Sequence, residues 1–109
     1  MKSATDTIAI RVVVFKDDGN WVAQCLEYDI GAQAESMDLL NDRLKVVLMA
    51  EFKESMERHQ APFAGIDPAP ERFQRMWERR AQSFKVSPAL APWMIGQNNP
   101  AHLDFGLVA

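Results

Sequence analysis

Apolar and polar positions recur with two different periods in the first half of the chain. Residues 7–15, which read TIAIRVVVF, are rich in β-branched side chains and predict a strand. Alternate residues of this stretch point to opposite faces, and both faces are mostly apolar: Ile8, Ile10, Val12 and Val14 share one, and Ala9, Arg11, Val13 and Phe15 share the other. Such a pattern is typical of a central strand or of one covered on both sides.

The next residues predict an antiparallel return. Residues 16–20 form a turn, because Asp and Asn bond to their own backbone and Gly19 tolerates a positive φ. Residues 21–28 then pair with the first strand, and after a bend residues 31–35 are long enough for a third strand.

A helical period follows at residues 36–60. Ser36 is a suitable N-cap, and Asp38 lies in the first turn, where the helix dipole favours a negative charge. Apolar residues recur at steps of three and four and predict one buried stripe: Met37, Leu40, Leu44, Val47, Leu48, Phe52 and Met56. No Pro or Gly interrupts the segment, so we predict a long helix that covers the sheet.

The second half has weaker periodicity. Residues 61–66 read as a connector, and Asp67 is predicted to cap a second helix with Pro68 in its first turn. A second apolar stripe is predicted on that helix: Phe73, Met76, Trp77, Ala81 and Phe84. Prolines and a glycine then predict an irregular tail, in which apolar Leu90, Trp93, Met94 and Ile95 should pack down, and residues 103–108 are a candidate terminal strand.

We therefore predict an α+β fold. Its core is a three-stranded antiparallel meander followed by a long covering helix, in the order β-β-β-α, over residues 1–60. Residues 61–109 add the C-terminal helix and the proline-rich packing segment to the same single domain. At 109 residues the chain is long enough for one modest core.

Three short motifs carry a resemblance to a known family. They are Gly19-Asn20-Trp21-Val22-Ala23, then Glu27-Tyr28-Asp29-Ile30-Gly31-Ala32-Gln33-Ala34, and then Ser36-Met37-Asp38-Leu39-Leu40. In this order they resemble the hairpin, bend, short strand and capped helix of the HicB-like antitoxin domain. The resemblance covers roughly residues 7–56, and the chain has Glu27-Tyr28-Asp29-Ile30 where that family carries a proline-containing bend.

The resemblance implies a protein-interaction role. HicB-like domains mask an mRNA-cleaving toxin, so the implied partner is a small basic toxin-like protein, and they also self-associate. In that family a separate C-terminal DNA-binding motif reads the operator. This chain has one helix and a proline-rich segment there, so we expect an orphan relative without a DNA-binding extension.

Charge and composition narrow the classes of function. The net charge of −3 argues against general nucleic-acid binding, and no recognition helix with its supporting helix is visible, so we expect no sequence-specific DNA contact. The first 60 residues hold 7 Lys and Arg against 11 Asp and Glu, while the rest hold 5 against 4. No apolar run reaches membrane-spanning length and residues 1–7 lack a signal-peptide core, so we expect a cytoplasmic protein.

Candidate chemistry is sparse. A lone cysteine inside a strand, Cys25, is expected to be a small buried residue rather than a nucleophile. His59 fits a helix end and His102 a loop. The HicB-like resemblance extends to part of the ribonuclease H fold, but the first strand carries no carboxylate for the metal site of that fold, whereas four acids lie elsewhere: Glu27, Asp29, Glu35 and Glu51. We therefore predict no catalytic residue, no metal site and no cofactor.

Two classes of function remain. The first is a non-catalytic interaction module that contacts a partner through a sheet edge, the tail or the second helix. A row of arginines on the second helix suits a phosphate or an acidic partner. A solvated helix face explains the row as well. The candidate partner-binding residues are Arg72, Arg75, Arg79, Trp77, Trp93 and Phe105. The alternative is a small enzyme or ligand-binding protein with a pocket near Trp77 and Trp93. Surplus apolar residues in the second half also predict a symmetric homo-oligomer with the second helix and the tail in the contact.

Overall fold

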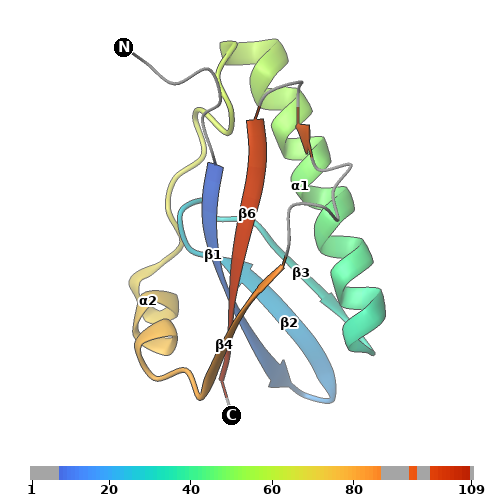
Figure 1. Ribbon diagram of the computed structural model, residues 1–109, viewed down its shortest axis with the longest axis vertical. Helices are drawn as coiled ribbons and strands as arrows, with labels where there is room; N and C mark the ends of the chain where they lie inside the picture. The colour runs from blue at the N-terminus through green and yellow to red at the C-terminus, as the bar shows by residue number, and fades with distance from the viewer. Residues whose placement is uncertain (1–7, 87–93, 96–98, 109) are drawn as a thin grey trace.

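The fold of the chain was obtained as a computed structural model, which describes residues 8–86, 94–95 and 99–108. Its first half has the predicted order. Strand β1 (Ile8–Asp17) turns into β2 (Asn20–Cys25), β3 (Gly31–Ala34) follows, and helix α1 (Met37–His59) closes the unit (Figure 1). The pairs β1–β2 and β2–β3 are both antiparallel.

Local residues account for each boundary of this half. Asp18 and Gly19 have φ of 52° and 84°, which is the two-residue hairpin turn whose twist matches the strands. Ser36 caps α1, since its hydroxyl accepts a hydrogen bond from the Leu39 amide at 3.2 Å. The helix ends at Gln60, which adopts the left-handed conformation and donates its amide to the Met56 carbonyl.

The second half corrects the predicted sheet. Strands β4 (Gln82–Val86), β5 (Met94–Ile95) and β6 (Asn99–Leu107) follow helix α2 (Glu71–Glu78). Within the described residues the sheet has the order β3-β2-β1-β6-β4, and β5 pairs with β6. Because β6 runs parallel to β1 and antiparallel to β4, the sheet is mixed, and the predicted all-antiparallel meander is only its first part. The candidate strand at residues 103–108 is confirmed as the end of β6.

The second helix is shorter than predicted. It begins at Glu71 rather than at Asp67, and it has no side-chain N-cap. Asp67 and Ala69 each precede a proline, which disfavours helical backbone, and both bond to the neighbouring bend instead. The Asp67 carbonyl accepts from Asp29, and the Ala69 amide donates to Leu26. The predicted stripe also ran too far, since Ala81 follows the helix and Phe84 belongs to β4.

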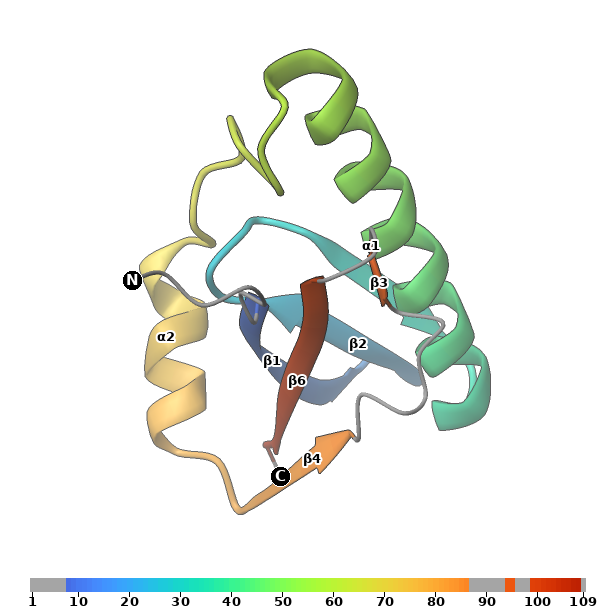
Figure 2. The same ribbon diagram turned by 45° about the horizontal axis from the view of Figure 1, so that its top comes forward.

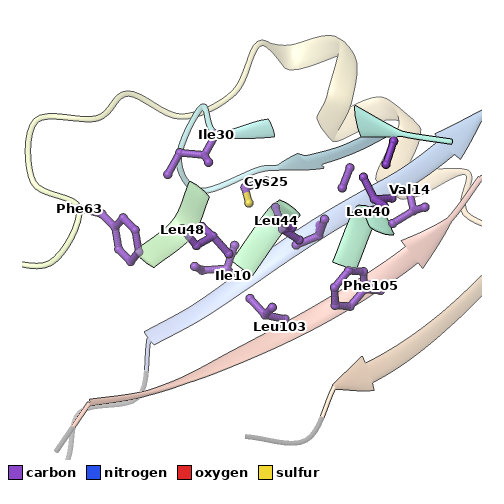
Figure 3. Packing of buried hydrophobic residues seen from close by; sticks show 13 residues of the cluster. Ile10, Val14, Cys25, Ile30, Leu40, Leu44, Leu48, Phe63, Leu103 and Phe105 are labelled. Atoms are coloured by element: carbon purple, nitrogen blue, oxygen red, sulfur yellow. The ribbon is translucent and has the colours of Figure 1, made fainter. Parts of the chain in front are cut away.

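The two helices lie on opposite faces of the sheet (Figure 2). Under α1 lies the larger core, built from one face of β1 together with β2, β6 and the helix (Figure 3). Its buried members include Ile10, Val12, Val14, Cys25, Leu40, Leu44, Leu48, Leu103 and Phe105. Of the predicted α1 stripe, Met37 is 38% exposed and does not belong to the core.

The connector after α1 also contributes to this core, which the sequence did not predict. Phe63 is 1% exposed and stacks on Tyr28 with ring centroids 4.7 Å apart. Its backbone is left-handed, at φ 56°, and its amide donates to the hydroxyl of buried Ser55 at 2.7 Å. That hydroxyl in turn donates to the Phe52 carbonyl, so one serine links the last turns of α1 to the connector.

Candidate protein-binding surface around helix α2

The face of the sheet opposite α1 carries the smaller core. Val13 and Leu26 are buried there under Phe73 of α2, and Phe15 stacks on Phe73 at 6.3 Å between ring centroids. Met76 and Trp77 pack beside them. Helix α2, from the second half of the chain, thus covers the face of β1 that carries Val13 and Phe15.

Trp77 occupies the centre of this surface. Its indole is half-buried and lies against Gly106 of β6, where an added Cβ would meet the ring at 2.7 Å. The guanidinium carbon of Arg80 lies 4.2 Å from the ring centroid, and that of Arg11 lies 5.9 Å from it. Cations at such distances are attracted to the indole face.

Arg11 is itself held in place by an acid. Its Nε donates to Glu27 Oε2 at 2.6 Å, while its backbone amide donates to Glu27 Oε1 at 2.7 Å. Glu27 therefore spans the end of β2 and the middle of β1. Burial raises the pKa of the neighbouring Tyr28 phenol, and the negative charge of Glu27 raises it further. Glu27 is thus an ion-pair residue here rather than part of a cluster of acids.

The predicted arginine row lies on the exposed side of α2. Arg72 places its guanidinium carbon 4.5 Å from the Phe73 ring centroid. Arg75 pairs with Glu71 at 3.6 Å, but both side chains are well exposed, so this pair contributes little. Arg72 and Arg79 are exposed and form no salt bridge within residues 8–86. The alternative interpretation of the row, a solvated face on which Glu71 pairs with Arg75, therefore agrees with the exposure of all three arginines and with this pair.

Of the two remaining predicted partner-binding residues, the structure describes Phe105, which does not join this surface. Phe105 is 5% exposed and lies in the core under α1, on the other side of the sheet from Trp77. Trp93 lies outside the described residues. Sequence reasoning missed Arg11, Glu27 and Gly106, although the single charged residue inside an apolar strand was a signal for Arg11.

A groove of about 390 Å³ opens beside α2 at the hairpin end of the sheet. Its lining is mainly apolar and comprises Phe15, Lys16, Trp21, Met76, Leu107 and Val108. The Lys16 ammonium lies 5.2 Å from the centroid of the Trp21 ring. The groove adjoins Met76 and so lies next to the position where the sequence predicted a pocket near Trp77.

A second, smaller hollow lies at the end of α1. Its volume is about 160 Å³, and residues of the last helical turns and of the connector line it: Glu51, Glu54, Ser55, Arg58, His59, Ala64, Gly65 and Ile66. Arg58 already pairs with Glu54 at 3.1 Å. His59 lies at the helix end, as predicted, whereas His102, which was predicted in a loop, lies in strand β6.

The described side chains offer little for catalysis. Cys25 is buried, and burial together with the nearby Glu27 charge raises the pKa of its thiol to about 12. Among the described residues no three His, Cys, Asp or Glu side chains come together as a metal site. No helix in the described part of the chain has the length and apolarity needed to cross a membrane.

Comparison with known protein families, with curated proteins and with solved structures finds no match to this chain. The function proposed below is therefore argued from the geometry of the described surface.

Proposed function

We propose that the chain is a non-catalytic protein-interaction module that binds an acidic segment of a partner protein on the exposed side of α2. The observation that carries the proposal is the stacking of guanidinium groups on aromatic rings: Arg80 and Arg11 on Trp77, and Arg72 on Phe73. Trp and Arg are the residue types that dominate the binding energy of protein interfaces.

Stacking supports this role for a physical reason. A guanidinium group resting on a ring has lost part of its conformational freedom before a partner arrives, which lowers the entropic cost of binding. Arg11 and Arg80 are already engaged, by Glu27 and by the Trp77 carbonyl. Arg72, in contrast, forms no salt bridge in the described part of the chain, and its guanidinium can match a carboxylate with two parallel hydrogen bonds. Arg72 and Arg79, which lack salt bridges in the described part of the chain, supply the uncompensated positive charge.

The HicB-like resemblance enters the proposal for residues 8–60 alone. The order β1, β2, β3, α1 and the Ser36 cap support it there, and they concern the architecture of the module. The partner that the resemblance implies is small and basic, whereas the α2 surface fits an acidic segment. The charge of the partner segment that the protein binds therefore distinguishes a basic, toxin-like partner from an acidic one.

The test uses peptides of defined charge. Wild-type protein is titrated with fluorescently labelled Asp- and Glu-rich peptides that also contain aromatic residues, and with their Lys-rich counterparts. Acidic peptides should bind, which raises the fluorescence anisotropy of their label, and the Lys-rich peptides should not. The single variants Arg72→Glu and Arg79→Glu should each weaken this binding at least about tenfold, which corresponds to a loss of about 1.4 kcal/mol.

A matched control reverses a charge away from α2. Arg58→Glu changes an arginine on α1 that is similarly exposed, and it should leave the affinity for acidic peptides unchanged. Equal weakening by Arg58→Glu would assign the binding to overall charge rather than to the α2 surface. Preference for the Lys-rich peptides would overturn the proposed partner chemistry.

The groove at Met76 supports a second candidate function, the binding of a small apolar ligand. Its volume suits a compact molecule, and Lys16 at its rim suits a carboxylate on that ligand. Native mass spectrometry of the purified protein tests this version, since a retained ligand adds a discrete mass. Met76→Trp, which should fill the groove, should abolish that added mass.

A further inference from the structure

The outer side of α1, turned away from the core, carries a second row of residues that includes exposed apolar side chains. Leu39, Val46 and Met49 are 37%, 66% and 49% exposed, although large apolar side chains are usually sheltered. Val46 and Met49 lie on the side of the helix opposite buried Leu44, so they point away from the sheet. This row is far from the α2 surface, because the two helices cover opposite faces (Figure 2).

The row has the spacing of a coiled-coil seam. Its members follow one another in steps of three, four, three, four and three residues: Leu39, Asp42, Val46, Met49, Lys53 and Met56. A seam of this kind keeps facing a second helix over its whole length. Asp42 and Lys53 are exposed, and Met56 is half-buried at the end of the row.

We propose that this α1 row is the contact through which two copies of the chain pair as an antiparallel, twofold-symmetric dimer. With the twofold axis beside the helix centre, Val46 of one copy faces Met49 of the other. The same register places Asp42 opposite Lys53, and Leu39 opposite Met56. Every apolar residue of the row then meets an apolar residue, and each charge meets its opposite.

The charges select the orientation as well as the register. In a parallel pair Asp42 would face its own counterpart, and so would Lys53, which places like charges together in the seam. In the antiparallel pair the twofold symmetry repeats the Asp42–Lys53 contact, so it occurs twice in the dimer. Ala50 is small and exposed beside the row, so it does not obstruct the approach of the second helix.

This contact differs from the one that the sequence predicted. Surplus apolar residues of the second half suggested α2 and the tail, but β6 and α2 use Leu103, Phe105, Phe73 and Met76 within the two cores. The inference stands apart from the proposed binding of acidic segments, because Asp42 and Lys53 contribute nothing to the α2 surface.

The experiment is a charge swap on the full chain, read by sedimentation velocity and light scattering over a range of concentrations. Wild type should approach twice the chain mass of 12.3 kDa as concentration rises. Asp42→Lys and Lys53→Asp should each raise the dimer dissociation constant at least about tenfold, since each puts like charges face to face. The double variant Asp42→Lys/Lys53→Asp should restore dimerisation.

Asp17→Lys serves as the control, because it makes the same charge change at the exposed hairpin, and it should leave the dissociation constant unchanged. Circular dichroism checks that each variant is folded. A wild-type mass of 12.3 kDa at every concentration would overturn the proposal. The proposal would also be overturned if neither single variant changed the dimer dissociation constant. The same holds if the double variant did not restore the wild-type dissociation constant.

Discussion

Cys25 is held as a neutral thiol by the core around it. It is fully buried, and its pKa is raised to about 12 from an ordinary value of 9.0. Below pH 9 the thiol is protonated in both the folded and the unfolded chain, so it adds no pH dependence. Between pH 9 and about 12 the unfolded chain loses the proton first, which favours unfolding by up to about 1.4 kcal/mol per pH unit.

Chemical denaturation across alkaline pH tests this account. Tyrosine and lysine residues titrate in the same range, so the useful quantity is the difference between wild type and Cys25→Ala. At neutral pH the variant should be less stable by about 1–2 kcal/mol, because it leaves a small cavity. That difference should shrink steadily above pH 9. A difference that stayed constant to pH 11 would show that the thiol ionises equally in both states.

Gly106 shows how a residue without a side chain positions one of the largest. The absence of a Cβ at this point of β6 lets the Trp77 ring and the Arg80 side chain lie against the strand, since a Cβ would come within 2.7 Å of both. Gly106→Ala should therefore displace the indole and cost about 1–3 kcal/mol, which is usual for overpacking. Tryptophan fluorescence and the unfolding midpoint report the two effects.

A double-mutant cycle distinguishes this clash from a general effect on the strand. In a Trp77→Leu background the smaller side chain leaves room for a Cβ, so Gly106→Ala should cost much less. An equal cost in both backgrounds would mean that Gly106 acts through the backbone of β6 or through the contact with Arg80, and not through the Trp77 ring.

At the scale of elements, α1 shows what periodicity can predict. Its cap at Ser36 and its buried face at Leu40, Leu44 and Leu48 were all visible in the sequence, because local bonding and a single apolar stripe determine them. The start of α2 was mispredicted for an equally physical reason. Asp67 resembles an N-cap locally, but its carbonyl pairs with Asp29 from a distant part of the chain. Non-local bonds of this kind leave no periodic signal.

The candidate surface around α2 was likewise predictable from the sequence only in part. Arg72, Arg75 and Arg79 were predicted as a row because helical spacing places them together. The stacking on Trp77 was not predictable, since it joins Arg11 of β1, Arg80 after α2 and Gly106 of β6. Only the mixed sheet brings those three segments side by side.

The buried face of α1 supports a prediction about stability. Leu44 is 1% exposed, so Leu44→Asp should place an unpaired charge in the core at a cost of several kcal/mol. That cost is comparable with the whole stability of a small domain, about 5–15 kcal/mol, and should abolish the cooperative melt. Met37→Asp places the same charge at a 38% exposed position of the same helix, outside the proposed dimer row, and should shift the melt only slightly. A normal melt for Leu44→Asp would contradict the assigned helix face.

For the whole molecule, the decisive element is β6. It lies between β1 and β4, and its register with β1 runs from Ile8 opposite Ala101 to Val14 opposite Leu107. Leu103 and Phe105 of β6 are buried under α1. The last strand of the described residues therefore lies inside the sheet. Residues 8–60 contact the second half of the chain along the pairing of β1 with β6, so the two halves do not form separate domains.

Truncation tests whether the rest of the chain folds without β6. A chain ending at residue 98 lacks β6, so β1 loses its neighbour on one side and the core loses Leu103 and Phe105. Burying two such side chains is worth about 3–6 kcal/mol, and the unpaired backbone of β1 adds to the loss. We expect no cooperative melt by circular dichroism. If the truncated chain melts cooperatively, the first three strands and the two helices fold without β6, and β6 is then a strand added beside a stable β1.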